Sequence, residues 1–136
     1  MRPPEQVRRD LVRQWLAKTD RDLAVAELLL GEGAAYYEAL AFHCQQAGEK
    51  YLKALLTWYQ VEFPRTHDIG QLLDLLAQVA ADAADSLQLL ESLTPYGVAP
   101  RYPGEPLELS DAQACEAVAL ARLARTIAGE RLSDWH

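Results

Sequence analysis

Apolar side chains recur every three or four residues along most of the chain, which is the spacing of helices that bury one face. This pattern predicts a first helix from about Asp10 to Leu30, ended by the glycines that follow it. It predicts a second helix from about Ala34 to Gln60, because Pro64 disfavours helix in the residue before it. The first nine residues, 1–9, contain two prolines and are predicted to form an arm without structure of its own.

The middle of the chain predicts a third helix that begins at about Ile69. Asp68 and Gln71 fit an N-cap pair, in which side-chain oxygens accept from the free N–H groups of the first turn. A weak break is expected near Asp82–Asp85, with Asp85 and Gln88 as a second cap pair before a helix over 86–93. One bent helix over 69–93 is the alternative, since no Gly or Pro enforces the break.

The last helix is predicted from its capping box. Ser110 is followed three residues later by Gln113, and an alanine stripe continues to about Ala128, where Gly129 is expected to end the helix and leave 129–136 as a tail. No segment alternates with the period of two that strands require. The chain is therefore expected to be all-α, an up-and-down bundle of four to five helices that forms one domain over 1–136.

Composition narrows the class of protein without naming a function. The 136 residues are 50% hydrophobic and carry a net charge of -7, which argues against broad binding to a nucleic-acid backbone. Cys44 and Cys115 lie in separate helical patterns, so no disulfide framework is expected, and no metal site is expected because no set of ligand residues has a recognisable spacing. The chain shows neither a membrane-length apolar run nor a signal peptide, and a cytoplasmic location is expected.

Candidate chemistry gathers on the second predicted helix, in the stretch FHCQQAGEKYLKALL. At about 100° per residue its apolar seam leaves a polar face opposite, and Glu49 can pair with Lys53 at the favourable spacing of four. The simplest interpretation is a solvated face. In a second interpretation the face meets the long loop over 94–109, where cations could hold a phosphate and tyrosines stack on a base. In a third, buried hydrogen bonds only pin that loop to the helix. The residues concerned are His43, Gln46, Glu49, Lys50, Lys53, Tyr96, Arg101 and Tyr102.

His67 and Asp68 stand at the start of the third predicted helix, with Arg65 nearby. Capping explains Asp68. His67 is explained less well by its position, and it could donate to a carboxylate such as Glu49 or face a phosphate.

Three segments together resemble the HEPN family of small helical domains. The second helix carries Gln46, Ala47, Glu49, Lys50, Lys53 and Ala54 at the family spacing, with Gly48 where Ala is more usual; His67 and Asp68 follow, and then Tyr96, Arg101, Tyr102 and Pro103. The resemblance spans about Trp15 to Ala128. It implies a domain that binds a nucleotide without a resident cofactor, that often forms homodimers, and that is often paired with a minimal nucleotidyltransferase in a toxin–antitoxin-like module.

The resemblance also allows two alternatives to nucleotide binding. One branch of the family consists of metal-independent ribonucleases with an Arg a few residues before a His, and here only Arg131 and His136 fit that spacing. In such an enzyme the His would act as a general base on RNA while the Arg stabilises the phosphorane. About 0.7 such pairs are expected by chance in this composition, so the match alone is weak. The other alternative is a structural bundle with no ligand.

Overall fold

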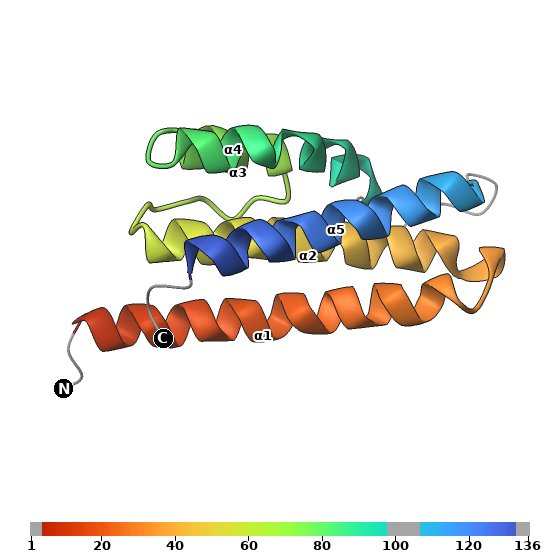
Figure 1. Ribbon diagram of the computed structural model, residues 1–136, viewed down its shortest axis with the longest axis horizontal. Helices are drawn as coiled ribbons and strands as arrows, with labels where there is room; N and C mark the ends of the chain where they lie inside the picture. The colour runs from red at the N-terminus through yellow and green to blue at the C-terminus, as the bar shows by residue number, and fades with distance from the viewer. Residues whose placement is uncertain (1–3, 98–106, 133–136) are drawn as a thin grey trace.

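The computed structural model describes residues 4–97 and 107–132. Within them the chain forms an all-α bundle, as the sequence predicts. Three long helices run side by side, and a layer of shorter helices covers one side of them (Figure 1). The elements in order are α1 (Pro4–Leu30), η1 (Ala34–Tyr36), α2 (Tyr37–Trp58), α3 (Ile69–Ala77), α4 (Ala81–Ser86), η2 (Gln88–Gly97) and α5 (Asp111–Arg131), where η marks a 3-10 helix.

The central element is α2, which contacts α1, α3, η2 and α5. Because it has neighbours on nearly every side, 14 of its 22 residues are buried. The alanine stripe of α5 is buried where α5 packs on α2, and Cys44 of α2 is fully buried. Burial raises the pKa of the Cys44 thiol to about 12, so this cysteine is a small apolar core residue.

The N-terminal residues that the structure describes are helical, which corrects the prediction of an unstructured arm over 1–9. Helix α1 begins at Pro4, a position that suits proline because first-turn N–H groups have no helical partner. The guanidinium of Arg8 lies 4.4 Å from the centre of the Trp58 ring and donates to the Trp58 carbonyl at 3.3 Å. These contacts hold the first turns of α1 against the end of α2.

Two further boundaries differ from the prediction. Helix α5 continues through Gly129 to Arg131, because Ala128 and Leu132 are both buried and Leu132 N–H donates to the Ala128 carbonyl at 2.9 Å. Gly129 therefore lies inside the helix, and the predicted tail begins later. The segment 69–93 is neither one helix nor two, since α3, α4 and part of η2 share it. Asp85 lies inside α4 and caps nothing, so the second cap pair was wrong.

The capping box of α5 is as predicted, whereas α3 has the predicted cap at Asp68 without its Gln71 half, because the Asp68 N–H donates to Thr66 Oγ1 at 3.1 Å. The Asp68 carboxylate accepts from the N–H of Gly70 at 3.0 Å. Ser110 and Gln113 form the reciprocal capping box, with N–H donors 3.1 and 2.9 Å from their acceptors. Between α2 and α3 the backbone turns at Gln60, whose φ of 61° lies in the left-handed region. This turn sends residues 61–68 back along α2, where they cover its polar face.

Candidate functional site

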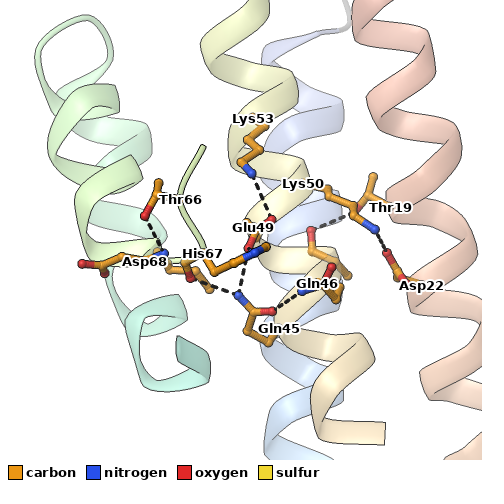
Figure 2. Close-up of polar contacts among 12 residues, drawn as sticks. Thr19, Asp22, Gln45, Gln46, Glu49, Lys50, Lys53, Thr66, His67 and Asp68 are labelled. Atoms are coloured by element: carbon orange, nitrogen blue, oxygen red, sulfur yellow. Dashed lines mark hydrogen bonds and ion pairs between the residues drawn. The ribbon is translucent and has the colours of Figure 1, made fainter. Parts of the chain in front are cut away.

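The polar face of α2 is enclosed by α1 on one side and by the 61–68 segment on the other (Figure 2). Two groups of charged side chains form there. We call Glu49, Lys53 and His67 the loop-side cluster, and Asp22, His43 and Lys50 the α1-side cluster. In each, one carboxylate lies between a lysine and a histidine.

Glu49 is the centre of the loop-side cluster, and its side chain is only 3% exposed. One oxygen, Oε1, accepts from His67 Nδ1 at 2.7 Å and from Gln45 Nε2 at 3.2 Å, while Oε2 accepts from Lys53 Nζ at 3.1 Å. An ionised carboxylate has no proton to donate, so the proton of this His67 contact is on Nδ1. The carboxylate is thus fully engaged by three donors, which is the condition for burying a charge at tolerable cost.

Lys53 is buried as well, against aromatic rings. Its ammonium lies 5.6 Å from the centre of the Trp15 ring and 5.9 Å from that of Phe63, close enough for cation–π attraction. The two rings pack against each other at 6.3 Å. This face of α2 is therefore not solvated, and the simplest interpretation of the sequence was wrong here.

Gln45 joins three segments and is fully buried. Its Nε2 donates to Glu49 and, at 3.2 Å, to the backbone carbonyl of His67, and its Oε1 accepts from Gln46 Nε2 at 2.7 Å. The end of η2 lies against it, since a Cβ on Gly97 would come within 2.6 Å of the Gln45 amide. Gln45 thus fixes the backbone beside His67.

His67 differs from the groups around it because its side chain is 75% exposed. Its Nδ1 is held by Glu49, so the opposite ring nitrogen, Nε2, is on the side of the ring away from the buried carboxylate (Figure 2). A histidine oriented in this way by a carboxylate can accept or donate a hydrogen bond at a defined place on the surface. Arg65 is exposed two residues earlier on the same segment and adds positive charge there.

The α1-side cluster joins two helices. Asp22 accepts from Lys50 Nζ at 2.6 Å and from His43 Nδ1 at 2.9 Å. All three side chains are half-buried, between 13% and 30% exposed. One turn along α1, Thr19 donates to the Ala47 carbonyl at 2.7 Å, so several polar contacts hold α1 on α2 in a defined register.

The structure brings together six of the residues that the sequence singled out: His43, Gln46, Glu49, Lys50, Lys53 and His67. It places the others differently. The Asp68 side chain caps α3, and Tyr96 lines a hollow of about 120 Å³ between η2 and α5. Arg101, Tyr102 and His136 lie outside the described residues.

Arg131 lies in the last turn of α5, where its guanidinium pairs with the carboxylate of Asp82 from α4. The same contact lowers the pKa of Asp82 and raises that of Arg131. Arg131 thus has a structural partner in the described part of the chain.

The candidate set from the sequence missed Asp22 and Gln45. Gln45 lies four and eight residues before Glu49 and Lys53, so helical spacing could have placed all three on one line. No sequence signal pairs Asp22 with Lys50, because the register of α1 on α2 comes from packing.

No group of three His, Cys, Asp or Glu side chains within 4–97 and 107–132 is arranged to hold a metal ion, and no helix there is long and apolar enough to cross a membrane.

The sequence profile of the HEPN domain matches residues 12–131, which is most of the chain. The chain belongs to the HEPN domain family. The motif that suggested the resemblance supplies Glu49, Lys50, Lys53 and His67 to the two clusters and Asp68 to the cap of α3.

Two solved structures are similar to this HEPN domain over most of their length. The protein TT1696 from Thermus thermophilus is 30% identical, with a TM-score of 0.69 over 89% of this chain and 98% of that one. ST0689, an archaeal HEPN homologue, is 28% identical, with a TM-score of 0.64 over 88% of this chain and 96% of that one. A comparison with curated proteins finds no match.

Proposed function

We propose that this HEPN domain is a nucleotide- and partner-binding module, and that its partner is a minimal nucleotidyltransferase in a toxin–antitoxin-like pair. The observation that carries the nucleotide part is the exposed imidazole of His67, held in place by the buried carboxylate of Glu49. A positioned histidine with a neighbouring arginine suits the phosphate groups of a nucleotide. The protein as a whole is acidic, so a local site of this kind favours a small anion over a long nucleic-acid backbone.

The proposal divides the residues of the site by role. His67 and Arg65 contact the phosphate, and Gln46, which is half-buried on α2, contacts the rest of the ligand, while Lys50 pairs with Asp22 and fixes α1 on α2. Glu49, Lys53 and Gln45 act through His67, because their polar atoms are used within the protein. In the structural alternative the same contacts exist but no ligand binds.

Calorimetric titration with ATP, GTP and their diphosphates tests the nucleotide part. We expect heat with at least one of them, and we expect His67→Ala to weaken that binding by roughly 10- to 100-fold, the worth of one charge-assisted hydrogen bond. Arg122→Ala is the matched control, since it removes an exposed cation that pairs with Glu27 across α1 and α5. The absence of heat with every nucleotide, both for the domain alone and with its partner, would contradict the nucleotide part of the proposal.

Co-expression tests the partner part separately. The gene beside this one is read first, and a minimal nucleotidyltransferase encoded there is co-expressed with the tagged domain. We expect the two proteins to elute together in gel filtration. Separate elution at micromolar concentration, or no such neighbouring gene, contradicts the partner part and leaves nucleotide binding to be judged by calorimetry.

A further inference from the structure

A hollow of about 220 Å³ lies where α1, α2 and α5 meet. The last turns of α5 run beside α1 there (Figure 1), and Tyr51 of α2, which is 1% exposed, forms the floor between them. None of the side chains that line the hollow belongs to the loop-side or the α1-side cluster, so the proposed nucleotide site does not use it. Sites for drug-sized ligands start at about 300 Å³, so this hollow suits a smaller molecule.

The walls of the hollow are apolar. Leu16 lines it from α1, and Ala128 and Leu132 line it from α5, where they are about one helical turn apart. Gly129 also lines it and has no side chain to fill the space, since a Cβ there would meet nothing within 4 Å. The hollow therefore offers an aliphatic group an apolar surface on two sides.

Two opposite charges stand at the rim of the hollow. Asp20 reaches it from α1 and accepts a hydrogen bond from the Tyr51 hydroxyl at 2.7 Å. Arg125 reaches it from α5 and makes only a loose contact of 3.9 Å with Glu27, a carboxylate to which Arg122 donates at 2.6 and 3.0 Å. Within the part of the chain that the structure describes, no ion pair joins Asp20 to Arg125, although both line one hollow. Opposite charges held apart in this way leave a place for a ligand that carries both.

We propose that this hollow binds a free α-amino acid with an aliphatic side chain, such as leucine. Such a molecule carries an ammonium group and a carboxylate on one carbon atom at neutral pH. The ammonium donates to Asp20, which the Tyr51 hydroxyl holds in place, and the carboxylate accepts from Arg125. The aliphatic side chain lies against Leu16 and Leu132. A peptide carries its two charges at opposite ends, and an aliphatic amine or acid carries only one, so neither fits the rim as well.

The expected affinity is moderate. Asp20 is exposed and the side chain of Arg125 is 52% exposed, so water screens both rim charges. For a ligand as small as leucine we expect a Kd of roughly 0.1–1 mM. Alanine has the same two charges but a much smaller apolar group to bury, so it should bind roughly 10- to 100-fold more weakly.

An NMR titration of the isotope-labelled full chain with leucine tests the proposal. We expect saturable shifts of the backbone amide signals of Leu16, Arg125 and Gly129, which line the hollow. The amide signal of Gly70, which lies beside the loop-side cluster, should not move. The absence of saturable shifts at millimolar leucine, or shifts confined to residues outside the hollow, would overturn the proposal.

Two charge variants and two truncated ligands test which group meets which. Asp20→Asn keeps an acceptor for Tyr51 but removes the charge. It should weaken leucine and isopentylamine, which lacks the carboxylate, by roughly 10-fold, and leave isocaproate, which lacks the ammonium, unchanged. Arg125→Met should weaken leucine and isocaproate and leave isopentylamine unchanged. The matched control is Arg21→Met, which removes an exposed arginine of α1 outside the hollow and should bind leucine like the wild-type protein.

Gly129→Leu tests the hollow by filling it. Leucine favours helix and its Cβ would meet nothing within 4 Å, so thermal unfolding should not occur at a lower temperature than in the wild-type protein. Leucine binding should nevertheless be lost, and circular dichroism checks that each variant keeps its helices. Undiminished binding by Gly129→Leu, or an equal response of the two truncated ligands to each charge variant, would overturn the proposal.

Discussion

The loop-side and α1-side clusters contain the same three kinds of side chain, yet they differ in which member is exposed. In the loop-side cluster the carboxylate of Glu49 is 3% exposed and the imidazole of His67 is 75% exposed. In the α1-side cluster the carboxylate of Asp22 is 13% exposed and the imidazole of His43 is 30% exposed. A buried carboxylate under an exposed imidazole positions a group for a ligand, whereas three half-buried groups between two helices fix the helices.

The difference arises from what each cluster joins. Asp22 and Lys50 are on two long helices whose packing also involves Thr19 and Tyr51, so the polar contacts add to an existing register. Burial and a hydrogen bond to Asp20 raise the pKa of the Tyr51 phenol, so it stays protonated and donates. His67 is on a segment without regular structure, and Glu49 and Gln45 supply the contacts that hold it there. The same chemistry therefore supports packing in one place and orientation in the other.

The largest expected effect comes from removing the buried carboxylate. Glu49→Leu leaves the Lys53 ammonium buried without its partner, and we expect it to lower the free energy of unfolding by about 3–5 kcal/mol. Asp22→Leu should cost about 1 kcal/mol, because its lysine can turn to water. Urea denaturation measures both.

The double variant Glu49→Leu and Lys53→Leu is the control for this comparison. Replacing a buried ion pair by apolar side chains is often close to neutral, so the double variant should recover most of the lost stability. Equal losses for Glu49→Leu and Asp22→Leu would show that the two clusters do not differ as proposed.

A smaller effect is expected from crowding Gln45. A Cβ at Gly97 would lie 2.6 Å from the Gln45 amide, which is buried and cannot move without losing its bonds to Glu49 and to the His67 backbone. We expect Gly97→Ala to destabilise the fold by about 1–3 kcal/mol in thermal or urea unfolding. Gly129→Ala is the matched control, since its Cβ would meet nothing within 4 Å inside α5, and it should stabilise by about 1 kcal/mol. A neutral Gly97→Ala would mean that η2 does not constrain Gln45.

The sequence predicted the helices and two of their caps well, because those features depend on local chemistry. Asp68, Ser110 and Gln113 act within four residues of their own positions, and the alanine stripe of α5 needs only helical spacing. The start of α1 and the end of α5 were harder to predict from the sequence. Packing of Arg8 on Trp58 extends α1 toward the N-terminus, although the prolines there indicated an unstructured arm. Burial of Leu132 extends α5 past the glycine that was expected to end it.

The candidate site was predicted in part, for a similar reason. Angular position on α2 correctly separated Lys53 from the apolar seam, but it could not show that Trp15 and Phe63 cover this lysine. A contact between His67 and Glu49 was foreseen as one possibility, and it forms at 2.7 Å. Predicting the role of Asp22 would have required the register of α1 on α2. That register depends on how the apolar faces of the two helices interlock, and the sequence around Asp22 does not indicate it.

The smallest stability change, and the sharpest functional one, is expected from the two histidines. His67→Ala removes one of three donors to Glu49, and since Lys53 and Gln45 remain, the loss should be only about 0.5–1.5 kcal/mol. His43→Ala should cost a similar amount, because Asp22 keeps Lys50. Their effects on nucleotide affinity should differ: we expect a large loss for His67→Ala and little change for His43→Ala. If both variants weaken binding equally, the ligand lies across the two clusters, and the α1-side cluster contacts it instead of only fixing the helices.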